Sequence, residues 1–205
     1  MPRPKSYDRQ DAIAKACSAF WEHGFQDLGV RELERLTGLN QFAIRSEFGG
    51  KEGLYLETLN YYCDAAITAE MAPMKQGSIA EIIAFFQGLV TLGSITSSDY
   101  GCLIVNTGIE NARIQSPKLE TVVRTYWNTL ESHFKNALEN EQAAQGGVAT
   151  FTPQTLAASL VPAVIGIHGQ NRSLRDQTAG RPLVDLLCSI LKGYRPSRRF
   201  NPSPR

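Results

Sequence analysis

Two polar side chains, Gln41 and Arg45, stand four residues apart in a short segment whose apolar residues have helical spacing. Residues four apart lie on one face of an α-helix, so both side chains would point outward together. A glutamine amide can make two hydrogen bonds with adenine, and an arginine guanidinium can bind guanine or a phosphate. The pair therefore favours contact with DNA, and the alternative is two solvated side chains on a short helix.

Three neighbouring residues extend this candidate surface. Phe42 either meets the methyl group of a thymine or packs against the first helix of the chain. Lys51 begins the next helix, where we expect it to bind a phosphate together with local backbone amides, unless it is an ordinary surface lysine. The full set of predicted DNA contacts is Gln41, Phe42, Arg45, Ser46 and Lys51.

The segment that would position these side chains covers residues 30–54 and has the pattern of a helix-turn-helix. Gly38 lies in the turn, and Asn40 suits the N-cap of the second helix because its side chain can accept a bond from a free amide. Ile44 and Phe48 share the opposite face from Gln41 and would hold the helix to a core.

Apolar spacing elsewhere also predicts helices and no strands, so we expect an all-α protein. An initial helix is expected over residues 8–23, and a longer one over residues 51–71 that Pro73 ends. Ser78 to Glu81 is a capping-box pattern that opens another helix. Later helices are expected over 101–106, from Pro117, from Pro153 with a kink or break at Pro162, and over 183–194, with a mobile loop at 141–150.

Composition limits the possible functions. The 205 residues carry a net charge of +1, and 42% are hydrophobic, which is enough for a buried core. We find neither a secretory signal nor an apolar run of the roughly 18 residues that a membrane span needs, so we expect a cytoplasmic protein without a membrane partner. The four cysteines are scattered, which argues against a metal site, and no cofactor or catalytic motif is present, so we expect no enzyme.

The predicted DNA-binding part has no excess positive charge. Residues 1–56 contain eight lysine or arginine residues and eight aspartate or glutamate residues. Strong non-specific DNA binding depends on neutralising phosphates, so this balance argues against it. A few well-placed contacts would still suffice for specific binding.

These residues resemble the tetracycline-repressor (TetR) family of bacterial transcription regulators. The residues that carry the resemblance, in the family's order and spacing, are Phe20, Gly24-Phe25, Val30, Leu33, Gly38-Leu39-Asn40, Phe48, Lys51-Glu52 and Leu54. A later string, Gly101-Cys102-Leu103, Asn106 and Glu110, is similar to one subgroup of the family. The resemblance implies a three-helix DNA-binding head followed by a larger helical domain that dimerises and holds an inducer.

The chain also departs from the family's pattern. Glu34 stands where a small residue is usual, and Leu28-Gly29 replace the Ser or Thr that would cap the second helix. Arg45 replaces a tyrosine that usually touches a phosphate, and Glu47 replaces a histidine and would repel phosphate if it faced DNA. These changes bear on the operator sequence and the affinity more than on the fold.

The resemblance also suggests residues in the larger domain. Cys102 is a candidate electrophile or oxidant sensor, because a helix N-terminus lowers the pKa of a thiol, or else a small buried residue. Phe86, Tyr126 and Trp127 either line an inducer cavity or belong to the core. The predicted dimer contact is a four-helix arrangement of the last two helices through Leu160, Val164, Leu183, Leu187 and Ile190.

The sequence therefore predicts a DNA-binding head at residues 1–56, a ligand-binding and dimerisation domain at 57–195, and a basic, proline-rich disordered tail at 196–205. The predicted function is a homodimeric repressor that reads a two-fold related operator and responds to a small-molecule inducer. The alternative is a ligand-binding or interaction module whose head does not bind DNA.

Overall fold

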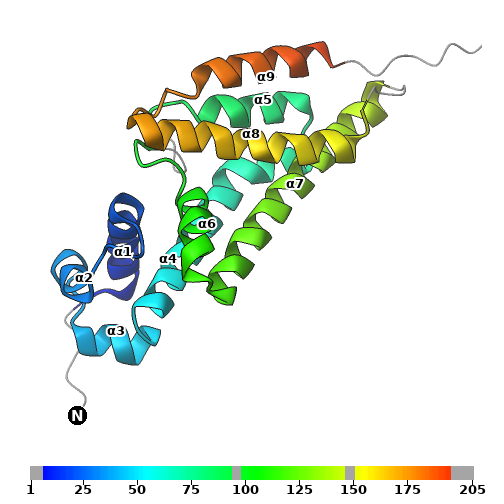
Figure 1. Cartoon of the computed structure of the whole chain (residues 1–205). Coiled ribbons are helices and arrows are strands. Elements are labelled where there is room, and N and C mark those ends of the chain that lie inside the picture. Colours follow the sequence, from blue (N-terminus) through cyan, green and yellow to red (C-terminus); the bar gives the residue numbers. More distant parts are fainter. Residues whose placement is uncertain (1–6, 94–97, 146–150, 195–205) are drawn as a thin grey trace, which may run out of the picture.

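The computed structural model describes residues 7–93, 98–145 and 151–194, and within these ranges the chain forms helices and no strand (Figure 1). The predicted all-α class is confirmed. The predicted tail at 196–205 lies outside the described residues.

Three short helices form the N-terminal head: α1 (Arg9–His23), α2 (Val30–Thr37) and α3 (Gln41–Phe48). The side chain of Asp8 caps α1, and the side chain of Asn40 caps α3 as predicted. The helix α2 has no side-chain cap at its N-terminus, which agrees with the glycine found there.

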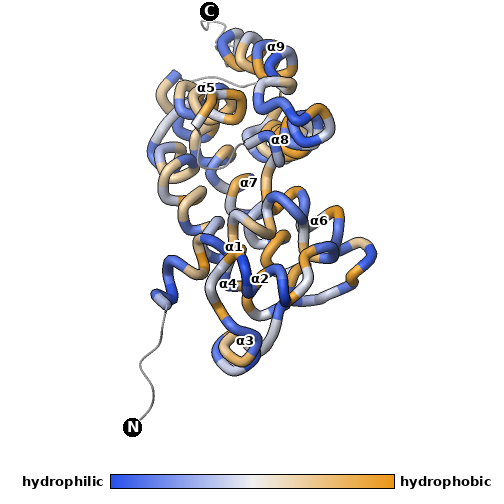
Figure 2. The backbone as a smooth tube through the Cα atoms, turned by 90° about the vertical axis from the view of Figure 1, so that its left-hand side faces the viewer, coloured by the Kyte–Doolittle hydropathy of each residue, from blue (hydrophilic) through white to orange (hydrophobic). Residues whose placement is uncertain are grey.

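The rest of the described chain forms α4 (Lys51–Ala66), a π-helical segment (Ile67–Met71), a 3-10 segment (Ala72–Lys75), α5 (Ile79–Gly88), α6 (Leu103–Ile114), α7 (Pro117–Gln145), α8 (Pro153–Leu174) and α9 (Arg181–Gly193). Helix α3 lies at one end of the molecule, and α8 and α9 lie at the other (Figures 1 and 2). Helix α4 continues through residue 56, where the sequence suggested a domain boundary, so head and body share this helix.

Aromatic contacts mark the two ends of one continuous core. In the head, the rings of Phe20 and Tyr55 lie 4.6 Å apart between centroids. In the body, Phe86 and Phe134 stack nearly parallel at 5.7 Å. Stacked and tilted pairs of this kind add to the free energy gained by burying the rings.

Some predicted boundaries were right and others were wrong. The helix predicted over residues 51–71 is α4 followed by the π-helical segment, which ends at Met71 as expected. Pro73 lies in the first turn of the 3-10 segment that follows, where a missing N–H costs no bond. Residues 141–145 belong to the end of α7 rather than to a loop. Pro162 does not break α8, and the helix predicted at 101–106 starts at Leu103 and continues to Ile114.

Candidate nucleic-acid interface

Helix α3 has one buried face and one open face. Ile44 and Phe48 are buried, as their spacing predicted. The exposed residues of the helix are Gln41, Phe42, Arg45 and Ser46. The structure therefore brings together four of the five predicted DNA contacts on a single surface at the end of the molecule.

Phe42 is the most unusual residue on this surface. Its side chain is 78% exposed, so it does not pack against α1. An exposed aromatic side chain beside glutamine and arginine is available for an apolar contact with a base.

Two side-chain oxygens fix the N-terminus of α3. The Asn40 Oδ1 accepts a bond from the Ala43 amide at 2.8 Å, and the Glu34 Oε1 accepts one from the Gln41 amide at 2.5 Å. Glu34 reaches across from α2, which explains how a carboxylate is accommodated where the family has a small residue. No local pattern predicts this cap, because the two residues belong to different helices.

Other carboxylates of the head also have partners. Glu32 pairs with Arg35, and this hydrogen bond lowers the pKa of the Glu32 carboxyl group. Glu47 is half-buried beside Tyr7, and burial together with the neighbouring Glu47 carboxylate raises the pKa of Tyr7 to about 12. Glu47 is therefore held against the start of the chain and does not extend freely into solvent.

Lys51 is half-buried and lies against the turn between α1 and α2. Its ammonium group is 4.7 Å from the centre of the Phe25 ring and donates to the Gln26 carbonyl oxygen at 3.4 Å. Burial lowers the pKa of this lysine. Gly50 gives α4 no side-chain cap. The N-terminus of a helix is a common place for an anion such as phosphate to bind.

The candidate sensor residues lie inside the body. Cys102 is the N-cap of α6, is 1% exposed, and accepts a hydrogen bond from the Tyr62 hydroxyl at 3.2 Å. Burial raises the pKa of its thiol despite the helix N-terminus. Phe86 is fully buried in the core, and Trp127 is half-buried with its ring edge-on to Tyr126 at 5.0 Å.

Tyr126 also lines a hollow of about 440 Å³ between α4 and α7. Cys63 and Asp64 lie on its α4 side, and Thr125 lies on its α7 side. Cys63 is half-buried there. This hollow combines apolar walls with a few polar groups, as small-molecule sites do.

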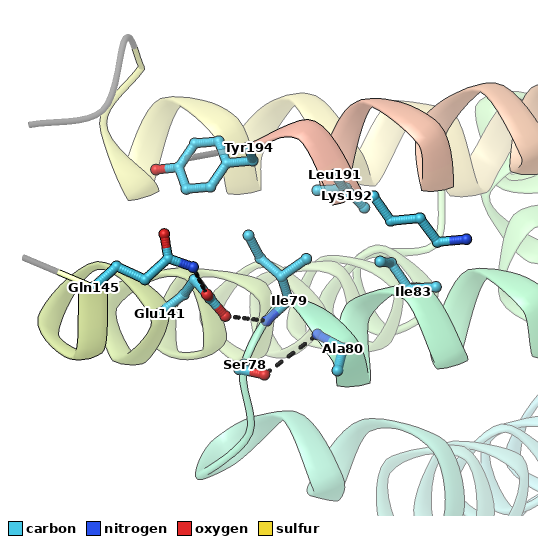
Figure 3. A pocket seen from close by; sticks show the side chains of 9 residues that line it. All are labelled: Ser78, Ile79, Ala80, Ile83, Glu141, Gln145, Leu191, Lys192 and Tyr194. Carbon is cyan, nitrogen blue, oxygen red and sulfur yellow. Dashed lines mark hydrogen bonds between the residues drawn. The ribbon is translucent and has the colours of Figure 1, made fainter. Parts of the chain in front are cut away.

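A second hollow, of about 490 Å³, lies where α5 begins and α7 and α9 end (Figure 3). The amide of Ile79 at its edge already donates to the Glu141 carboxylate at 3.2 Å. The Ile79 amide at the start of α5 thus already has a hydrogen-bond partner within the protein. None of the predicted ligand residues lines this hollow.

The predicted dimer residues divide into three groups. Leu160 and Val164 are 3% and 2% exposed, because they face the core of their own protomer. Leu183 and Leu187 are half-buried. Ile190 is 57% exposed, so of the five predicted residues it alone has an open side chain.

Ile190 is joined by residues that the sequence prediction left out. Leu186 lies one turn earlier on α9 and is 56% exposed, and Ile165 on α8 is also exposed. A side chain added at Gly166 would meet no atom, so the surface of α8 is open at that point. The apolar stripe on α9 is wide enough to face both the core of its own protomer and the outside, and spacing alone does not distinguish the two faces.

Two kinds of site are absent from the ranges that the structure describes. No cluster of three or more histidine, cysteine or acidic side chains there could hold a metal ion. No helix in the same ranges has the length and apolar character to cross a membrane.

Comparisons with known proteins support the predicted helix-turn-helix head. No family model matches the chain. The chain is 24% identical over 201 residues to the HTH-type transcriptional repressor ComR of Escherichia coli K12, covering 93% of this chain and 90% of ComR.

Solved structures agree along most of the chain. A TetR-family transcriptional regulator from Cytophaga hutchinsonii has a TM-score of 0.78 at 15% identity and covers 95% of this chain and 100% of that one. A cysteine mutant of the TetR-family regulator CifR, in complex with a 26-bp double-stranded operator DNA, has a TM-score of 0.75 at 18% identity and covers 94% and 100%. This chain therefore has the fold of the TetR-family transcriptional regulators.

Proposed function

We propose that the protein is a transcriptional repressor of the TetR type that binds operator DNA through α3. The observation that carries the proposal is the exposed group of Gln41, Phe42, Arg45 and Ser46 on a helix anchored by buried residues. The likeness to ComR, a repressor, and to CifR, which is bound to operator DNA in its structure, supports it. Helix α3 would enter the major groove, with the start of α4 and Lys51 near a phosphate.

A second copy of the chain completes this function. We assign the dimer contact to the open face of α8 and α9, where Ile165, Leu186 and Ile190 are exposed. Burying these side chains between two copies would form a four-helix contact. The two heads would then read a two-fold related operator in successive major grooves.

The inducer is assigned to the hollow between α4 and α7 that Tyr126 and Cys63 line. Because α4 also supports the head, a ligand there can favour one head orientation over another. It does so only to the extent that it binds the two orientations with different affinity.

DNA binding by the wild type and by Arg45→Ala tests the proposal. Fluorescence anisotropy would measure affinity at two salt concentrations for duplexes selected from genomic DNA by the wild-type protein. We expect Arg45→Ala to weaken binding about 10- to 100-fold, as the loss of a two-pronged base contact does. The control is Arg124→Ala, which removes an exposed arginine on α7 and should leave binding unchanged.

Two outcomes would contradict parts of this proposal. Equal losses in both arginine variants would mean that the effect is general electrostatics and not recognition by α3. A wild-type protein that enriches no DNA from the genome would support the alternative, an interaction module whose neutral head no longer binds DNA.

A further inference from the structure

The turn between α1 and α2 is held by a residue of the body. The Glu110 carboxylate of α6 accepts hydrogen bonds from two consecutive amides, Phe25 at 2.8 Å and Gln26 at 3.2 Å. Both bonds reach the same oxygen, Oε2. Charge-assisted bonds to paired backbone amides are stronger than neutral ones, so this contact is a firm link between body and head.

Gly24 makes room for this carboxylate. It has a φ of 82°, and a Cβ at this position would lie 2.3 Å from the Glu110 Oε1. A larger residue at position 24 would therefore be strained in its backbone and would displace the carboxylate. The turn and the glutamate are fitted to each other at a separation of 85 residues in the chain.

Lys51 holds the same turn from the α4 side. Its ammonium group lies over the Phe25 ring and donates to the Gln26 carbonyl oxygen. The turn thus donates two amides to a carboxylate on α6 and accepts a bond from a lysine on α4. The negatively charged Glu110 on α6 and the positively charged Lys51 on α4 therefore hold the same α1–α2 turn from two sides.

The head has a second attachment near the other end of α6. The Trp21 indole N–H donates to the Gly101 carbonyl oxygen at 3.0 Å. From α8, the Arg172 guanidinium donates to the carbonyl oxygens of Tyr100 at 3.0 Å and Trp21 at 3.4 Å. These two attachments along α6 add to the packing of α1 and α3 against α4 in holding the angle of the head relative to the body.

We propose that Glu110 is a positioning residue that fixes the orientation of the DNA-binding head relative to the body by holding the α1–α2 turn. The consequence for DNA rests on the proposed repressor function: in a dimer, this orientation sets the distance between the two copies of α3. Glu110 touches no DNA in this proposal and determines which half-site spacing the dimer accepts.

The test compares wild type, Glu110→Ala, Glu110→Gln and the control Glu120→Ala in the full-length protein. Affinity is measured for the selected operator, for operators with one base pair added or removed at the centre, and for a single half-site. We expect Glu110→Ala to bind the full operator about tenfold more weakly, because only a fraction of its heads are correctly placed. Its half-site affinity should match the wild type, and its preference among spacings should flatten to within about threefold.

The variant Glu110→Gln keeps an acceptor oxygen but removes the negative charge, so it tests the two contributions separately. Its side-chain oxygen can still accept both amides, so Glu110→Gln should keep the spacing preference. Glu120 pairs with Arg124 on the same helix, α7, so Glu120→Ala should behave as wild type. A Glu110→Ala protein that keeps the full spacing preference would overturn the proposal, even if all its affinities fell together.

Hydrogen exchange of the backbone amides provides a readout that does not require DNA. In Glu110→Ala, the amides of residues 25 and 26 should exchange about tenfold faster or more, while the core of α1 stays protected. Unchanged exchange rates at these two amides would show that Glu110 does not hold the turn and would overturn the proposal. If the wild type binds no DNA, the repressor proposal fails, and hydrogen exchange still decides whether Glu110 holds the head.

Discussion

Two cysteines near the α4–α7 hollow differ in exposure and therefore in expected reactivity. Cys102 is almost fully buried, and burial raises the pKa of its thiol. Cys63 is half-buried at the hollow, and burial, then the neighbouring Cys102, raises its pKa to about 12. Since the thiolate is the reactive species, neither thiol should react readily in this conformation.

This difference predicts an order of alkylation. In folded protein at pH 7.5, iodoacetamide should modify Cys63 first and Cys102 only after urea unfolds the chain. A pKa near 12 leaves about a thousandfold less thiolate than a free cysteine has at this pH, so the rate at Cys63 should keep rising as the pH increases beyond 9. Peptide mass spectrometry measures the order, with buried Cys188 as an internal reference.

The opposite order would change the assignment of Cys102. Modification of Cys102 before Cys63 in folded protein would show that the body opens readily around α6. That result would support the predicted sensor role, which otherwise requires a conformation other than this one.

At the scale of the element, α8 carries a buried histidine close to the contacts between head and body. His168 is fully buried, its Nδ1 has no hydrogen-bond partner among the described residues, and burial lowers its pKa to about 4. Its backbone carbonyl oxygen lies against Gly101, where a Cβ would be 2.8 Å away. The backbone of α8 therefore lies against the start of α6 at a residue whose buried imidazole is neutral.

This histidine predicts a loss of stability in acid. Its pKa is lower in the folded state than the ordinary 6.5, so its contribution is fully present above pH 6.5 and is lost as the pH falls toward 4. The shift corresponds to about 3 kcal/mol of unfolding free energy at pH 4. Urea unfolding from pH 7.5 to 4.5 measures it.

The variant His168→Gln provides the comparison. As the pH falls below 6, the unfolding free energy of this variant should decrease less steeply than that of the wild type. The two slopes should differ by about 1.4 kcal/mol per pH unit, whatever the stability of the variant at pH 7.5. The control is His23→Gln, which changes an exposed histidine at the end of α1. Equal slopes in wild type and His168→Gln would show that the imidazole gains a proton without unfolding.

At the scale of the whole molecule, the proposed DNA-binding end and the proposed dimer face lie far apart. Helix α3 is at one end and α8 and α9 are at the other (Figures 1 and 2). Helix α4, the contacts of α6 and the Arg172 side chain of α8 connect the proposed dimer contact with the proposed recognition surface. Changes at the dimer face should act on operator binding through assembly and not through α3 itself.

The double substitution Leu186→Glu with Ile190→Glu tests the dimer face. Placing charges on two exposed apolar residues of α9 should prevent burial between copies and yield monomers. Light scattering would then give the 22.6 kDa of one chain in place of twice that mass. Full-operator affinity should fall while half-site affinity remains.

The control places one charge on an exposed apolar residue elsewhere. Ile109 on α6 is also exposed, and Ile109→Glu should leave the mass unchanged. A double variant with the mass of a dimer would mean that the copies associate through another surface.

The sequence by itself determined the helices and which side chains of α3 are exposed, because local interactions specify both. The caps at Asp8 and Asn40 are formed within one turn of the chain. The spacing of Ile44 and Phe48 places the opposite face of α3 outside, whatever the rest of the molecule does.

Only the tertiary structure decided how the apolar helices share their faces and how the head is held. Leu160 turned inward and Leu186 outward because packing against neighbouring helices chooses between two apolar faces that periodicity cannot distinguish. Lys51 lies against the Phe25 ring, and Glu110 meets the α1–α2 turn from 85 residues away. Such contacts join segments that are distant in sequence, and no local pattern of residue types encodes them.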